Sequence, residues 1–207
     1  MRMIRSWALL ALPLLALCAW SQPSAAPAPL AADAGSSQPV SDQDFGVVPE
    51  AAEPLPNFHQ VAEGIYRSAE PKAEGFKRLA QMGIKTILDL KLHVDDDDLE
   101  SAAALGMKIE SVPMNGLLSP SFAQLDRALA VLQDPAKKPV LIHCRYGRDR
   151  TGVTVAAYRV AVQGVAPAAA AQEAQSFGCC PPLFKNLPDY LSRYLQHRQA
   201  ANLSLQP

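Results

Sequence analysis

The sequence predicts an α/β fold in which helices cover both faces of a central sheet. Short apolar stretches of strand length alternate from residue 58 onward with stretches whose apolar residues recur at helical spacing. A tight loop at residues 144–150 joins one such strand to a following helix. Strands that alternate with helices pack as layers, because each apolar sheet face needs a helical cover.

The first half of the domain is expected to hold four strands and two helices. The strands are expected at residues 58–61, 65–67, 86–90 and 108–112, and the helices at 72–82 and 96–105. Phe76, Leu79 and Ala80 fall on one side of the first helix, which gives it an apolar face. Gly83 and Gly106 are expected to end the two helices, because glycine is the usual helix-stopping residue.

The second half is expected to hold one central strand among four helices. The helices are expected at residues 120–133, 151–162, 167–175 and 187–197, and the central strand at 140–143. Phe122, Leu125, Leu129 and Leu132 have the spacing of a core-facing helix stripe. In such sheets ligands bind at the carboxyl ends of the strands, so the site is expected just after residue 143.

The front of the chain is predicted to be an export signal followed by a linker. Two arginines lie in residues 1–5, and the apolar run at 7–20 is short for a membrane span. Cleavage is expected after Ser21, with Ala34 as a second option and an uncleaved anchor still open. We expect a disordered Ala/Pro-rich linker at 22–56, a domain at 57–200, a tail at 201–207 and a periplasmic location.

The overall charge excludes a global nucleic-acid footprint. The 207 residues carry 19 Lys and Arg against 20 Asp and Glu, a formal net charge of −1. A run of aspartates at 95–98 lacks the spaced ligands and the glycine of a calcium loop, so it is interpreted as a turn and an acidic helix start. No metal or other cofactor is expected.

The loop that follows the central strand has the composition of an anion cradle. Cys144 lies six residues before Arg150, with Gly147 between them, and a helix follows. Amides of such a loop and the helix start favour a bound anion and would also stabilise a thiolate. The planar Arg150 fork could grip two phosphate oxygens. A nucleophile beneath a phosphate cradle indicates cleavage of phosphate esters through a cysteinyl-phosphate intermediate.

These residues resemble the H-C-x5-R-T-G signature of the protein tyrosine phosphatase superfamily, in particular its dual-specificity branch. The stretches 65–71 (IYRSAEP) and 83–90 (GIKTILDL) are similar to segments of compact bacterial and fungal members. The resemblance runs from about residue 58 to 197. It implies the central sheet of a dual-specificity phosphatase, with Cys144 as nucleophile and Arg150 as phosphate clamp.

The general acid departs from the common pattern. Relatives usually supply it from an aspartate in the loop after the fourth strand, and the matching loop at 113–120 contains no acid. Asp149 lies inside the cradle, where myotubularin-like lipid phosphatases and some secreted bacterial phosphatases place an acid that they use. We expect Asp149 to protonate the leaving group; the alternative is that it only pairs with an arginine. Asp126 is a weaker candidate for the acid, and Asn115 could help to order a water.

The remaining residues of the loop are assigned to support and to substrate contact. Thr151 is expected to donate a hydrogen bond to the sulfur, to cap the helix, or both. By the resemblance, His143 supports the loop. The expected phosphate and substrate contacts are Arg145, Tyr146, Gly147, Arg148, Asp149 and Arg150. Arg145 and Arg148 are basic at positions where lipid and inositol phosphatases of the superfamily carry basic residues; alternatively they are solvated rim residues.

Two further cysteines precede Pro181. Cys179 and Cys180 are interpreted as small buried residues at a turn; a disulfide between them, or one with Cys144, is left open. Three cysteines after signal removal is an odd number, which fits a Cys144 that stays reduced.

The leading hypothesis is a phosphatase for phosphotyrosine, and also phosphoserine or phosphothreonine, in proteins. An inositol-phosphate or phosphoinositide phosphatase is the alternative enzyme, and a phosphate-binding module without turnover is the alternative of another class. The expected partner is a phosphorylated protein or an inositol phosphate, with no nucleic acid and no membrane contact except through an uncleaved anchor.

Overall fold

The computed structural model describes residues 53–179 and 186–204, with side chains described as far as residue 201. The predicted signal peptide, nearly all of the predicted linker, Cys180 and residues 205–207 lie outside the described residues. Within the described part, no helix combines the length and apolar character that crossing a membrane requires.

The sheet has five strands in the order β1-β2-β5-β3-β4. The strands are β1 His59–Ala62, β2 Ile65–Ala69, β3 Thr86–Asp89, β4 Lys108–Ser111 and β5 Val140–Cys144. β1 pairs antiparallel with β2, and every other pair is parallel. The central strand β5 is buried at all five positions, as expected for a strand that has neighbours on both edges and helices on both faces.

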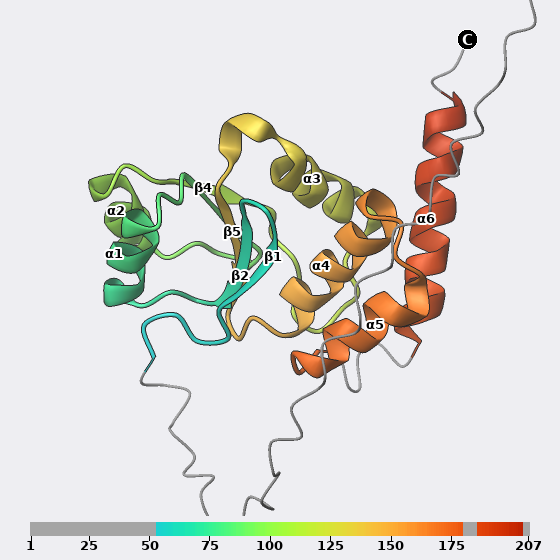
Figure 1. Cartoon of the computed structure of the whole chain (residues 1–207), viewed down its shortest axis with the longest axis horizontal. Helices are drawn as coiled ribbons and strands as arrows, with labels where there is room; N and C mark the ends of the chain where they lie inside the picture. The colour runs from blue at the N-terminus through green and yellow to red at the C-terminus, as the bar shows by residue number, and fades with distance from the viewer. Residues whose placement is uncertain (1–52, 180–185, 205–207) are drawn as a thin grey trace, which may run out of the picture. The chain divides into compact units, whose positions relative to one another are not determined.

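Helices cover both faces of the sheet, as predicted (Figure 1). α1 Ala73–Gln81 and α2 Asp96–Ala104 pack on one face around Phe76, Ile87 and Leu141. The larger core on the other face includes Leu88, Ile142 and the four remaining long helices. These are α3 Phe122–Gln133, α4 Asp149–Val162, α5 Pro167–Ser176 and α6 Leu187–Ser204, and a short helix η1 Pro135–Lys137 precedes β5.

The structure moves three predicted boundaries. α4 begins at Asp149 rather than at residue 151, because the loop turns directly into the helix. α6 runs to Ser204, so the predicted tail from residue 201 is still helical at its start. The packed chain also begins before the predicted domain start at residue 57. Leu55 is buried in the core, and the Ala69 amide donates to the Pro56 carbonyl at 2.7 Å.

The strand register decides what meets at the carboxyl edge of the sheet. Cys144, the last residue of β5, pairs with Ala69 at the end of β2. The preceding residue, His143, pairs with Ser68 of β2 on one side and with Asp89 at the end of β3 on the other. Three strands therefore end together around the loop that leads from Cys144 into α4.

Candidate active site

The loop between β5 and α4 forms an anion cradle. β5 ends at Cys144 and α4 begins at Asp149, which leaves four residues for the turn. The first bond of the helix runs from the Gly152 amide to the Arg148 carbonyl at 2.7 Å. Amides at such a helix start point toward the loop and favour an anion. Cys144 has a free thiol and is 2% exposed, so its sulfur lies at the floor of the cradle.

Gly147 has no room for a side chain. Its φ is +65°, and a Cβ at this position would lie 2.6 Å from the backbone of Ser68 and Ala69. The Gly147 carbonyl accepts hydrogen bonds from Arg67 Nη2 at 2.6 Å and from Asn57 Nδ2 at 3.1 Å. The loop is therefore pressed against β2 and held there by two side chains.

Gly152 allows close packing behind the loop. A Cβ at Gly152 would lie 2.8 Å from Cβ and 2.9 Å from Sγ of Cys179. Cys179 is buried after a turn, as interpreted, and it is disulfide-bonded, which is the alternative that the sequence left open. Because Cys144 is free, it takes no part in that disulfide.

The Arg150 side chain lies beside the cradle, between the end of β3 and the 113–120 loop. Its Nη1 donates to the carbonyls of Leu90 and Met114, each at 3.4 Å. Gly116 lies alongside, with the position of a Cβ 3.6 Å from Arg150 Cζ. The guanidinium is thus oriented by the end of β3 and by the 113–120 loop, which suits the clamp role predicted for it.

His143 and Thr151 are both buried below the loop. Burial, followed by the charges of Lys91 and Arg150, lowers the pKa of His143 to about 3, so the imidazole is neutral at physiological pH. A neutral, enclosed ring agrees with the supporting role expected for it. The Thr151 hydroxyl is buried without a hydrogen-bond partner among the described residues, which leaves its proton available for the cysteine sulfur.

Of the acid candidates, only Asp149 is part of the cradle. It is the first residue of α4 and is half-buried. Asn115 is exposed, and its Oδ1 accepts from the Leu117 amide at 2.7 Å. Asp126 accepts from the Tyr194 hydroxyl at 2.8 Å and lies 3.3 Å from His197 Nε2, so it ties α3 to α6.

The two outer arginines of the loop, Arg145 and Arg148, lie beside different cavities. Arg145 and Tyr146 are exposed, with the guanidinium 5.8 Å from the ring centre. They border a cavity of about 590 Å³ whose other lining residues are Pro56, Ala69, Glu70, Pro71, Lys72 and Asp98. Arg148 packs against Gly178 and borders a second cavity of about 370 Å³, on the side of Phe177.

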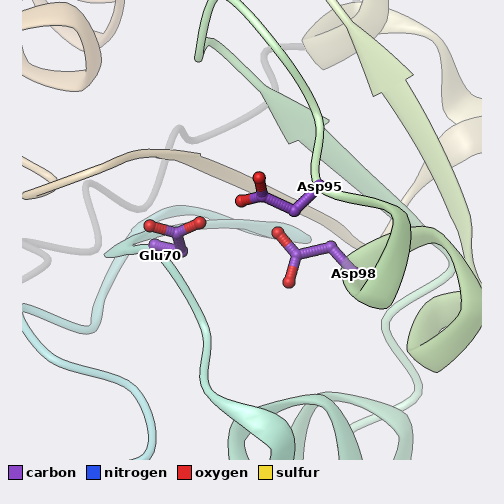
Figure 2. Close-up of side chains that lie close together, drawn as sticks. All are labelled: Glu70, Asp95 and Asp98. Atoms are coloured by element: carbon purple, nitrogen blue, oxygen red, sulfur yellow. The ribbon is translucent and has the colours of Figure 1, made fainter.

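A buried lysine that the sequence analysis missed lies at the end of β3. Lys91 Nζ donates to Glu70, to Asp95 at 2.7 Å and to Asp98 at 3.0 Å. Figure 2 shows the carboxylates of these three acids converging from two segments, with Glu70 after β2 and the two aspartates at the start of α2. The ammonium supplies the positive charge that binds them together. The acidic run at 95–98 therefore has a structural role at the start of α2, where negative charge is favourable.

Burial and charge together shift the pKa values of Lys91 and Asp89. Burial lowers the pKa of Lys91, but its hydrogen bonds to Asp95, Glu70 and Asp98 outweigh burial and hold it above its ordinary value. Burial raises the pKa of Asp89 to about 6, against the Lys91 amide that bonds it at 2.6 Å and the Lys91 charge. Lys91 therefore stays charged at neutral pH and links the end of β3 to the segment after β2.

Arg67 is the second residue of the site that the sequence analysis did not single out. Its side chain is 1% exposed although it lies inside a strand. The sequence held one signal of this burial: Arg67 lies in a predicted strand of a parallel sheet, where arginine is rarely found unless it has a specific partner. The alternation of side chains alone did not show that it would reach the Gly147 carbonyl.

Comparison with known proteins gives one consistent family. A family model described as "DSP-PTPase phosphatase fused to NAD+ Kinase" matches residues 44–181. The dual specificity protein phosphatase TpbA of Pseudomonas aeruginosa is 32% identical over 130 residues, which cover 62% of this chain and 58% of TpbA. The chain thus aligns with little more than half the length of that relative.

Two solved structures share the fold. The core catalytic domain of the PP-IP phosphatase SIW14 from S. cerevisiae has a TM-score of 0.63 and 28% identity, covering 74% of this chain and 96% of that one. A structure of P. aeruginosa TpbA in complex with pTyr has a TM-score of 0.54 and 30% identity, covering 67% of this chain and 82% of that one.

Proposed function

Because the chain belongs to the DSP-PTPase phosphatase family, we propose that it is a cysteine-dependent phosphatase that removes phosphate from phosphotyrosine, and also from phosphoserine or phosphothreonine, in proteins. One observation carries the proposal: a free thiol, Cys144, lies at the floor of an anion cradle, with the Arg150 guanidinium held beside it. The similarity to TpbA supports the same activity.

The proposed reaction has two steps. The Cys144 thiolate attacks phosphorus, the bond to the ester oxygen breaks, and Asp149 gives its proton to the leaving oxygen. The loop amides and Arg150 bind the phosphoryl oxygens as their charge redistributes. Water then attacks the phosphocysteine, Asp149 takes the water proton, and the sulfur leaves as a thiolate that the Thr151 hydroxyl stabilises.

An exposed ring and two carboxylates beside the cradle favour a phosphotyrosine side chain over an inositol polyphosphate. Tyr146 offers an exposed ring at the edge of the larger cavity, and Glu70 and Asp98 place carboxylates on its wall. Those carboxylates would repel additional phosphates on a substrate ring. The outer arginines, Arg145 and Arg148, and the likeness to the PP-IP phosphatase SIW14 favour the inositol alternative.

A substrate comparison tests the proposal. The kcat/KM of the full chain, measured without added metal, is expected to be at least about tenfold higher for a phosphotyrosine peptide than for an inositol pyrophosphate, a difference of about 1.4 kcal/mol in transition-state binding. The Arg145→Gln/Arg148→Gln variant provides the control, because it should weaken the inositol reaction more than the peptide reaction. A higher kcat/KM for the inositol pyrophosphate would assign the enzyme to the alternative class.

Asp149→Asn tests the general acid. The variant is expected to lose about 10²–10⁴-fold in kcat on an alkyl phosphate, whose leaving group needs a proton, and much less on p-nitrophenyl phosphate, whose leaving group does not. Asp126→Asn is the matched control and should keep both activities, since Asp126 bonds α6 instead. Full activity of Asp149→Asn on the alkyl phosphate would remove Asp149 from this role.

We also propose that the enzyme works in the periplasm. The charged start, the short apolar run at 7–20 and the small residue at the Ser21 cleavage position support this location. Recovery of a product that begins at residue 22 in the periplasmic fraction is the expected result, and a full-length product retained in the cytoplasm would contradict it.

A further inference from the structure

Arg67 lies on the same sheet face as the nucleophile, on the adjacent strand. Its Cα pairs with Ile142 in the parallel register, and two residues later Ala69 pairs with Cys144. Side chains two residues apart point to the same face of a sheet. Arg67 therefore projects toward α4, below the cradle, on the face that Cys144 shares.

The guanidinium of Arg67 is enclosed on all sides. Nη2 donates to the Gly147 carbonyl at 2.6 Å, and the Phe177 ring lies 4.2 Å from Cζ. Nε and Nη1 are buried without a hydrogen-bond partner among the described residues. Buried donors without partners are costly, so this position carries a charge that packing alone does not explain.

Two groups of opposite charge, Cys144 and Glu173, act on Arg67. Burial lowers the pKa of Arg67 to about 10, with the charges of Cys144 and Glu173 opposing this effect and that of Arg159 adding to it. The guanidinium is thus still a cation at neutral pH. Arg159 holds Glu173 through three hydrogen bonds of 2.7, 2.8 and 3.2 Å, so the charges of that pair largely cancel. A buried cation is strongly unfavourable without an opposite charge.

We propose that Arg67 is a positioning residue of the cradle, which keeps Cys144 in its thiolate form and fixes the loop through the Gly147 carbonyl. The same charge has two effects. The buried cation favours the anion at Cys144, and the thiolate in turn relieves the cost of burying the arginine. The guanidinium is buried beneath the Phe177 ring, so water screens both effects less than it would at the surface. The inference rests on the proposed function only in taking Cys144 as the nucleophile.

The ionisation of Cys144 can be read without any phosphatase assay. The rate of iodoacetamide alkylation of the full chain is followed from pH 4 to 9, with the modified Cys144 peptide quantified by mass. The folded Arg67→Gln variant is expected to shift the inflection upward by at least about one pH unit, a tenfold smaller thiolate fraction below the inflection. Arg67→Lys keeps the charge and loses the planar fork, so its inflection is expected near that of the wild type, with a lower kcat.

Two further variants separate this role from a merely structural one. Arg159→Gln/Glu173→Gln removes a neighbouring pair of opposite charges and is expected to lower the thermal midpoint without moving the inflection. Phe177→Ala admits water to the guanidinium and is expected to raise the inflection by part of the Arg67→Gln shift. If the Arg67→Gln variant does not fold, Phe177→Ala becomes the variant that decides the test.

An unchanged inflection in the deciding variant would overturn the inference. A shifted inflection in a protein that hydrolyses no phosphate ester would support Arg67 as the charge partner of Cys144 and count only against the proposed phosphatase. The two failures are therefore distinguishable.

Discussion

Replacing Cys144 with serine is expected to reduce turnover of p-nitrophenyl phosphate by about 10⁴-fold or more. The serine hydroxyl is isosteric but does not ionise at neutral pH, so the cradle would hold no nucleophile. The nitrophenolate leaves without a proton, and the result is therefore independent of which residue is the acid. The measurement is the initial rate of the reduced full chain in the presence of a chelator, with wild type and variant side by side.

Binding of a phosphotyrosine peptide distinguishes a folded but inactive Cys144→Ser variant from an unfolded one. Cys144→Ser is expected to retain the thermal midpoint of the wild type and to bind a phosphotyrosine peptide in calorimetry, because the loop amides and Arg150 remain. If the folded wild type shows no turnover but binds the peptide, the domain is a phosphate-binding module. Turnover by the serine variant at the wild-type rate would mean that another group attacks phosphorus.

Gly147→Ala is expected to disrupt the cradle itself. The methyl group would lie 2.6 Å from the backbone of Ser68 and Ala69, and an alanine at φ +65° adds about 1–2 kcal/mol of backbone strain. Because β2 cannot move without breaking its pairing with β5, the loop is expected to shift away from β2 and from Arg67. We expect a loss of at least about 2 kcal/mol in the free energy of unfolding, and of at least about 100-fold in kcat/KM.

Gly83→Ala is the matched control. Gly83 has a φ of +74°, and no atom lies within 4 Å of its Cβ position. It therefore incurs the backbone strain without the clash and lies far along the chain from the loop. Urea unfolding should show a loss of about 1–2 kcal/mol with unchanged turnover. Equal losses in both variants would show that strain alone, and not the contact with β2, decides the effect at Gly147.

The sequence by itself predicted the α/β fold, because its signals are local. Apolar stretches marked the buried strands β3 and β5, and Gly83 and Gly106 marked the ends of α1 and α2. The spacing of Cys144 and Arg150 between a strand and a helix located the cradle, since a short loop leaves the backbone few paths. Gly147 lies in that loop, and the structure identifies β2 as the element that the loop approaches there.

Tertiary structure alone decided which distant residues serve that loop. Arg67 and Gly147 are 80 residues apart, and Lys91 joins acids from two other segments of the chain. Periodicity tells which face a side chain lies on, but not which strand becomes its neighbour or what charge it meets there. The burial of Arg67 and Lys91 follows from the strand order β1-β2-β5-β3-β4, which brings three strand ends together around Cys144. The nucleophile was therefore encoded locally, whereas the charges that surround it depend on the long-range pairing of the sheet.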